Sequence, residues 1–444
     1  MRHSFFRTKC DYISRRKNLV NLSNQKQSTK LPPEVELLIY CAHPQRDATR
    51  AEKIRLLVIS GINWEYLIRL GRQHALTSLL YWNLNTTCPE SVPGDILHLL
   101  ERRFNINDFR NRFLTKELVR LLSLFKAHKI LAVPYKGPDL ASRAYGNVSL
   151  REFRDLDILI PKRDVSQAKN LLFAHEYRLR DLSAAQAQEA AYLREDYEYR
   201  FVLNDDQLNA GNDRGFFFRV VVGLHWRVTP PNLPFPFKAM RVWDHLEEVP
   251  LAGSTILSLA TEDLLLLLCL HGTKHRWERL AWICDIAALV STHQGIDWEW
   301  TVKQATKLGG ARMLFLGLGL AHSLLDTDIP QNVLRRIQTD IAIQSLLAEV
   351  NQHLFLSDTN DQNEDSEEAL IHLLRARERF LDRIKAYRHI GHHYRWMTPY
   401  AIDQAVLQLP PPLNILCYIF WPLRFVIKYV MSPARHFLRG ISDT

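Results

Sequence analysis

Asp155 and Asp157 are separated by one residue at the start of an apolar segment that continues to Ile160. In a β-strand, alternate side chains point to the same face, so these two carboxylates would project side by side while Leu156 and Ile158 pack on the other face. Adjacent carboxylates repel each other unless a cation lies between them. Mg²⁺ is usually held by one or two carboxylates together with substrate phosphate oxygens. We therefore predict that Asp155 and Asp157 bind Mg²⁺ (or Mn²⁺) and are catalytic residues of a phosphoryl displacement.

Lys136 and Gly137 precede the two aspartates, at the point where a short apolar segment gives way to a helical pattern. A glycine at this turn lets backbone amides approach a triphosphate, and the N-terminus of the following helix adds a favourable dipole. The alternative is a plain tight turn, with Pro138 at the start of the helix and Lys136 in solvent. An Asp-x-Asp pair alone is also common on protein surfaces. The prediction of a nucleotide site therefore depends on the two motifs together.

Together these motifs resemble the nucleotidyltransferase superfamily of the DNA polymerase β type, in which a glycine-containing turn opens a helix and an Asp-x-Asp strand follows. A closer resemblance is to an uncharacterised bacterial nucleotidyltransferase family, and it covers about residues 34–430. It implies an α+β fold: a polymerase β-like core, in which a mixed sheet packs with helices, flanked by N-terminal and C-terminal helical regions. The residues that carry it in its most specific part are Lys136, Gly137, Leu140, Ala141, Tyr145, Gly146, Arg151, Asp155, Leu156, Asp157, Ile158, Leu159 and Ile160.

The resemblance also implies a third carboxylate on a neighbouring strand, which would ligate the catalytic metal and assist deprotonation of the attacking hydroxyl. The matching segment of this chain is residues 222–226, where Gly223 occupies the acidic position. Loss of a metal ligand or general base costs on the order of 10²–10⁴-fold in rate. Either Glu198 or Asp196 on the preceding strand supplies the missing acid, or the protein binds nucleotide with little turnover.

Arg154 and His225 are further candidates for contacts to the nucleotide phosphates, and each has a structural alternative. Arg154, like Arg151, flanks the carboxylate strand and could neutralise phosphate charge or pair with Asp155 or a neighbouring glutamate. His225 could contact a phosphate, or it could be a hydrogen-bonded core histidine.

Lys274 is the last nucleotide-binding candidate. It lies in a basic, aromatic helical segment at residues 262–290, which the resemblance places over the nucleotide pocket, but it could equally be a solvated surface lysine. In the same segment His271 and His275 have the spacing of zinc ligands on one helical face. No glutamate follows His271 and no third ligand is evident, so we do not predict zinc.

Composition and periodicity divide the chain into six segments. They are a disordered basic leader (1–30), an N-terminal helical region (31–130), the nucleotidyltransferase α/β core (131–254), a helical domain (255–355), an acidic linker (356–370) and a basic C-terminal helical segment (371–444). Within the core we expect strands at 131–135, 156–160, 197–203 and 216–228, and helices at 139–145 and 165–175.

The net charge of +9 is concentrated at the two ends of the chain. The leader and the C-terminal segment are both strongly basic, so the body between them is slightly acidic. A surface that tracks nucleic-acid phosphates needs a concentrated basic footprint. We therefore predict no sequence-specific nucleic-acid binding, and we expect at most a peripheral contact of the basic termini with an anionic membrane.

The six cysteines are scattered without a Cys-x-x-Cys pair, so neither a zinc ribbon nor a disulfide framework is indicated. The N-terminus has no apolar stretch of signal-peptide length. The apolar run at 413–431 is interrupted by Pro422, Arg424 and Lys428 and is too broken to predict a membrane span. We expect a cytoplasmic protein, with a peripheral membrane contact as the alternative location.

From the motifs and the resemblance we predict a metal-dependent nucleotidyltransferase. It would transfer a nucleoside monophosphate from an NTP, with ATP expected, to a hydroxyl of an unidentified small molecule, sugar or protein. The alternative is a catalytically weak or inactive nucleotide-binding or scaffold protein in a biosynthetic pathway, because Gly223 replaces the expected third carboxylate.

Overall fold

The computed structural model describes residues 31–45, 47–180, 189–203, 219–229, 235–236, 240–355, 372 and 375–379. The predicted leader, the acidic linker and nearly all of the basic C-terminal segment lie outside the described residues. Within the part of the chain that is described, no helix has the length and apolar character needed to cross a bilayer.

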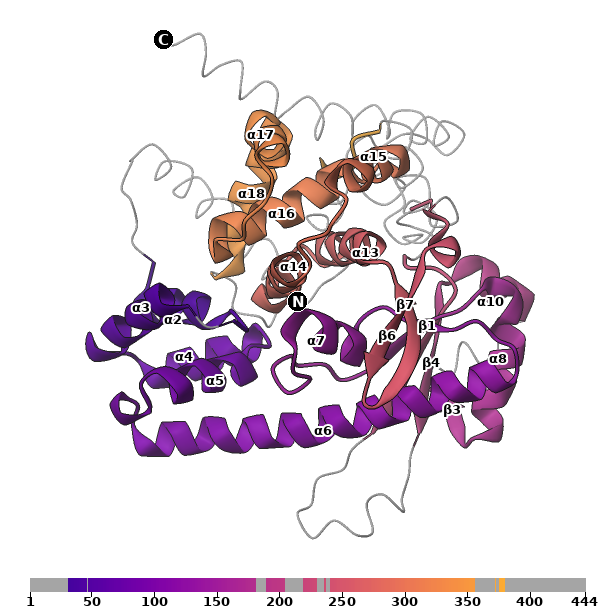
Figure 1. Ribbon diagram of the computed structural model, residues 1–444, viewed down its shortest axis with the longest axis horizontal. Helices are drawn as coiled ribbons and strands as arrows, with labels where there is room; N and C mark the ends of the chain where they lie inside the picture. Colours follow the sequence, from indigo (N-terminus) through magenta and orange to yellow (C-terminus); the bar gives the residue numbers. More distant parts are fainter. Residues whose placement is uncertain are drawn as a thin grey trace, which may run out of the picture.

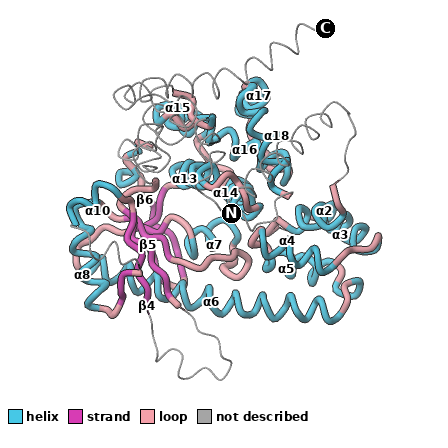
Figure 2. Tube along the Cα trace, turned by 180° about the vertical axis from the view of Figure 1, so that it is seen from behind, coloured by secondary structure: helices cyan, strands magenta, loops and turns pink. Residues whose placement is uncertain are grey.

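The N-terminal region is helical, as the periodicity predicts. Its elements are α2 (Pro33–Cys41), α3 (Ala48–Ile59), α4 (Trp64–Gln73), α5 (Thr77–Thr87), the 3₁₀ turn η1 (Pro89–Ser91) and α6 (Gly94–Ala127). Side chains cap the N-termini of α3 and α4. The side chain of Asp47 accepts a hydrogen bond from the backbone amide of Thr49, and that of Asn63 accepts one from the backbone amide of Tyr66. With 34 residues, α6 is about 50 Å long, and it carries α2 to α5 at one end and the strands at the other (Figures 1 and 2).

The central sheet has five strands in the order β1-β2-β5-β4-β3. The strands are β1 (Val133–Pro134), β2 (Leu156–Leu159), β3 (Tyr177–Leu179), β4 (Glu198–Leu203) and β5 (Val220–His225). β2 and β5 are parallel, whereas the other neighbouring pairs are antiparallel, so the sheet is mixed. This mixed sheet among helices, flanked by helical regions, confirms the predicted α+β fold class.

One face of the sheet forms the core of the α/β part. Leu156 and Ile158 of β2 lie opposite Val222 and Leu224 of β5, and all four are fully buried. They pack with apolar residues on the last turns of α6 and on α8 (Val165–Ala174). Because side chains alternate along a strand, the polar residues between them must point to the opposite face.

Two strand pairs go beyond the sequence prediction. β3 is only three residues long, too short for a periodic signal, and it pairs with the far end of β4. A hairpin of β6 (Leu246–Leu251) and β7 (Ser254–Leu259) precedes the next helix, which begins at Thr261 rather than at the predicted residue 255. The remaining short elements are α7 (Gly137–Tyr145), η2 (Lys162–Asp164), α10 (Glu189–Glu195) and η3 (Val242–Asp244).

The second helical region follows the hairpin. It consists of α13 (Thr261–Lys274), α14 (Leu280–Thr292), α15 (Trp298–Leu308), α16 (Ala311–Leu325), α17 (Gln331–Thr339) and α18 (Ile341–Leu354). The five consecutive leucines at 264–268 of α13 are all buried, because neighbouring helices cover α13 on several sides (Figure 1). A helix that is apolar all round is typical of such an internal position.

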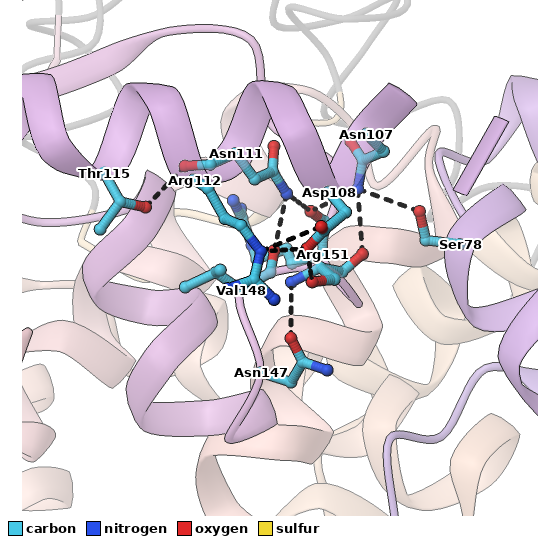
Figure 3. A network of polar contacts seen from close by, with 10 residues as sticks. Ser78, Asn107, Asp108, Asn111, Arg112, Thr115, Asn147, Val148 and Arg151 are labelled. Atoms are coloured by element: carbon cyan, nitrogen blue, oxygen red, sulfur yellow. Dashed lines mark hydrogen bonds and ion pairs between the residues drawn. The ribbon is translucent and has the colours of Figure 1, made fainter. Parts of the chain in front are cut away.

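Polar side chains of α6 hold the loop that leads into β2. Asn107 Nδ2 donates to the carbonyl oxygen of Ser149 at 3.0 Å, and Asn111 Nδ2 donates to those of Val148 and Arg151 at 2.6 and 2.7 Å (Figure 3). Both asparagines are buried, so these bonds satisfy loop carbonyls that water cannot reach. The loop before Asp155 is therefore fixed to the long helix.

Candidate functional site

The polar face of the sheet brings two acids, a histidine and a glycine together from three strands. Asp157 of β2 is paired with Gly223 of β5, and His225 of β5 is paired with Glu198 of β4. Residues paired across strands and residues two apart on one strand share a face. The register therefore places all four residues on the side of the sheet opposite the apolar core.

Three potential ligand atoms converge there. Nε2 of His225 lies 2.9 Å from Oδ1 of Asp157 and 3.3 Å from Oε2 of Glu198. All three atoms lie within 4.8 Å of one another, and no other group of three or more such residues occurs among the described residues. Nδ1 of His225 is buried and has no partner within the described part of the chain, so Nε2 is the ring nitrogen directed at the acids.

Gly223 lies directly beneath this cluster. A Cβ built on it would lie 2.7 Å from Nε2 of His225, 2.9 Å from Oδ1 of Asp157 and 3.3 Å from Oε2 of Glu198. The first two distances are shorter than carbon atoms tolerate, so any side chain would displace the ligand atoms. The glycine therefore leaves the space into which the three side chains project.

Glu198, one of the two acids considered from the sequence, is the one that reaches the cluster. It is buried and forms an ion pair with Arg200, whose Nη2 is 2.8 Å from Oε1. Burial alone would raise the pKa of Glu198, but the nearby His225 and Arg200 hold it below its usual value. The carboxylate of Asp196 instead accepts a bond from the backbone amide of Tyr197.

Lys136 is directed into the site. Its Nζ is 3.1 Å from Oδ2 of Asp157 and 3.3 Å from Nδ1 of His271, and its side chain is only 15% exposed. The alternative of a lysine in solvent is therefore not what the structure shows. The next residue, Gly137, has φ +60°, and a Cβ on it would be 3.4 Å from the carbonyl oxygen of Asp155. This conformation suits glycine and starts α7 next to the carboxylate strand.

The two aspartates differ in environment. Burial would raise the pKa of Asp157, but Lys136 and His225 outweigh it and hold the pKa well below the usual value. Asp155 is exposed at the start of the strand, and the charge of Asp157, with burial as a smaller cause, raises its pKa. Asp155 is adjacent to the three converging ligand atoms but is not part of that group.

The basic candidates take different positions. Arg151 forms a buried two-pronged ion pair with Asp285, at 2.7 and 2.8 Å, and the hydroxyl of Tyr145 donates to the same carboxylate. Its role is therefore structural. Arg154 is exposed, immediately before Asp155.

Lys274 lies at the edge of the same site, where it contacts Tyr197, a neighbour of His225. Its Nζ donates to the hydroxyl of Tyr197 at 3.2 Å and lies over that ring, which is 6.0 Å from the ring of His225. His271 and His275 make edge-on or tilted ring contacts with each other and with Trp282. Burial, then the charge of Lys136, lowers the pKa of His271 well below its usual value. No third ligand joins the two histidines among the described residues.

The ligand atoms of Asp157, Glu198 and His225 suit a divalent cation. Two carboxylates provide the oxygen ligands that Mg²⁺ and Mn²⁺ prefer, and an imidazole nitrogen is a common ligand of transition metals. The space over Gly223 is consistent with a bound ion.

A family model described as an uncharacterised nucleotidyltransferase matches residues 60–326, more than half of the chain. The matched segment includes α4 to α6, the whole sheet and α13 to α16. No curated protein matches the chain.

Proposed function

Because the match shows that the chain belongs to this nucleotidyltransferase family, we propose that it transfers a nucleoside monophosphate from an NTP, with ATP expected, to an acceptor hydroxyl. The observation that carries the proposal is the convergence of Asp157, Glu198 and His225 over Gly223, beside the turn at Lys136. The order of a glycine turn, a helix and an Asp-x-Asp strand supports placement in the polymerase β-like superfamily.

Asp157, Glu198 and His225 would hold the metal, with Asp155 as an additional ligand at the exposed side. When bound, Mg²⁺ or Mn²⁺ would bring the nucleotide phosphates to the carboxylates and stabilise the charge that develops there. The ionised state of Asp157, maintained by Lys136 and His225, is the state that a cation ligand requires.

The positive charge for the triphosphate would come from Lys136 and from the N-terminus of α7. The ammonium group of Lys136 lies between Asp157 and His271. Because Gly137 has no Cβ, a phosphate could approach the backbone amides of the turn closely. His225 and Lys274 are the further nucleotide-binding candidates, and Arg154 is a further candidate for a phosphate contact.

Glu198 is the proposed base for the acceptor hydroxyl. It occupies the neighbouring strand and reaches the ligand cluster from the side opposite to Asp157. The hypothesis of a catalytically inactive protein depended on the missing acid at Gly223. Since a carboxylate on β4 reaches the same space, that argument no longer favours the inactive alternative.

The experiment is pyrophosphate release from NTPs with Mg²⁺ or Mn²⁺, using the small-molecule fraction of a cell extract as a source of acceptors. We expect release with the parent and, from loss of a base or ligand, a reduction of about 10²-fold or more in Glu198→Gln. Glu248→Gln, an exposed glutamate on β6, is the matched control and should behave like the parent. Equal release by parent and Glu198→Gln would contradict the role of Glu198. Tight nucleotide binding without any release would support the inactive alternative.

A further inference from the structure

Four arginines gather where the N-terminal helices meet the loop before β2. Arg72 is at the end of α4, Arg103 and Arg110 are on α6, and Arg154 is on the loop. Arg103 and Arg110 are seven residues apart, which places them two turns apart on one face of the helix. The one acid that influences both of them is Glu152 on the same loop.

The two helical arginines have buried N–H groups without acceptors. Nη1 of Arg103 and Nε of Arg110 are inaccessible to solvent and have no hydrogen-bond partner among the described residues. Nη2 of Arg110 donates to Oδ1 of Asn107 at 2.6 Å. Asn107 is also a side chain that holds the loop before β2 (Figure 3). A buried guanidinium N–H without an acceptor is costly. Both side chains are only partly buried, so an anion bound to their remaining N–H groups would offset part of that cost.

The positive charges of the four arginines also repel one another. Burial, then the charge of Arg72, lowers the pKa of Arg103, and burial, then the charge of Arg154, lowers that of Arg110. Glu152 offsets only part of this repulsion, and its Oε1 already accepts from the amide of Ser78 at the start of α5. Four positive charges against one negative charge leave an excess that a dianion would neutralise better than a monoanion.

The position of the cluster relative to the catalytic carboxylates indicates which ligand it serves. Arg154 directly precedes Asp155, and three residues of extended chain from Glu152 to Asp155 span at most about 11 Å. The turn at Gly137, where the triphosphate is proposed to bind, is also close to Asp155, because a Cβ on Gly137 would lie 3.4 Å from the carbonyl oxygen of Asp155. A ligand of small size could therefore contact the arginines with one end and the carboxylates with the other.

We propose that Arg72, Arg103, Arg110 and Arg154 form a binding subsite for a phosphate group of the acceptor substrate, so that the acceptor is a phosphorylated small molecule. Arginine forks recognise phosphate through two parallel hydrogen bonds. This inference rests on the proposed function, because it assigns the second substrate of the same reaction.

The test is calorimetric titration of inorganic phosphate into the full chain while Mg²⁺ and a non-hydrolysable ATP analogue fill the nucleotide site. Phosphate should bind the parent, and Arg103→Met and Arg110→Met should each weaken it about tenfold. Arg102→Met, an exposed neighbour on the same helix, is the matched control and should leave phosphate binding unchanged. Acetate should bind much more weakly than phosphate. If a core variant does not fold, Arg72→Met, which removes an exposed side chain, carries the same expectation.

Undiminished phosphate binding in the arginine variants, or no phosphate binding by the parent, would overturn the proposal. Loss of the nucleotide analogue in Arg103→Met would also overturn it, because the cluster would then serve the nucleotide phosphates while the proposed function still stands. Failure of the proposed function gives a different result, namely that Asp157→Asn binds the analogue as tightly as the parent.

Discussion

Asp157 and Gly223 are paired across the parallel strands β2 and β5, and the missing side chain of Gly223 provides the space that the carboxylate of Asp157 uses. In the sequence, Gly223 occupies the position at which the resemblance implies a third acidic metal ligand. In the structure it is the position over which Asp157, Glu198 and His225 converge.

Gly223→Ala tests this relationship with one methyl group. The new carbon would lie 2.7 Å from Nε2 of His225 and must push the imidazole or the carboxylate of Asp157 aside. We expect Mn²⁺ affinity to fall about tenfold, with a modest loss of stability, because overpacking in a core costs about 1–3 kcal/mol. Gly295→Ala, at an exposed position where a Cβ would meet no atom within 4 Å, is the control for the substitution itself. Unchanged metal affinity in Gly223→Ala would contradict the arrangement.

Asp155→Asn and Asp157→Asn should affect stability in opposite directions. Asp157 forms an ion pair with Lys136, and its loss leaves a largely buried ammonium group without its partner, at a cost of about 1–3 kcal/mol. Neutralising Asp155 removes the repulsion between Asp155 and Asp157, so the melting temperature of the Asp155→Asn variant should be unchanged or slightly raised. Thermal unfolding of both variants without added metal checks this. A destabilised Asp155→Asn together with a fully stable Asp157→Asn would contradict the assignment of the two environments.

Arg151→Met should destabilise the protein without altering the nucleotide site. It leaves Asp285 buried without its charged partner, which costs about 3–5 kcal/mol. Adding Asp285→Asn should recover part of the loss, and urea unfolding measures both effects. Under native conditions MgATP binding should match that of the parent. Loss of MgATP binding with unchanged stability would instead identify Arg151 as a phosphate contact.

The buried carboxyl group of Asp139 should make the stability of the protein depend on pH. Burial raises its pKa from the ordinary 3.8 to about 6, although Arg143 and the hydroxyl of Ser258 partly counteract this. Between those two pH values the folded chain keeps a proton that the unfolded chain releases, so stability falls as the pH rises through this window. The full penalty above pH 6 is on the order of 3 kcal/mol.

Asp139→Asn should remove this penalty and flatten the dependence of the unfolding free energy on pH between about 4 and 6. Asp263, whose pKa burial also raises to about 6, contributes in the same window and should account for the slope that remains. Urea unfolding at a series of pH values measures the difference. An identical slope in parent and variant would show that Asp139 does not titrate in this window.

The sequence was sufficient for the features that depend on local pattern. The strand after Asp157, the turn at Gly137 and the fold class follow from alternation, a glycine and the resemblance. The convergence over Gly223 depends on the register of β5 between β2 and β4, which no local pattern encodes, and so Glu198 could be named only as one of two acids. The hairpin was missed because β6 is largely exposed and contains Pro250, a residue that normally argues against a strand.

The proposed acceptor subsite could not be predicted from the sequence for a similar reason. Arg103 and Arg110 lie on a long helix with many charged residues, and their spacing alone does not distinguish them from the exposed Arg102. Only the packing of α6 against the loop at 147–151 shows that these two side chains are partly buried.

Mn²⁺ binding in the presence of ATP, followed by electron paramagnetic resonance of the free ion, tests the central claim most directly. The parent should bind the ion, and Asp157→Asn, Glu198→Gln and His225→Ala should each weaken binding about tenfold or more, whereas Glu248→Gln should not. If Asp157→Asn and Glu198→Gln bind Mn²⁺ with ATP as tightly as the parent, the three residues do not form the metal site.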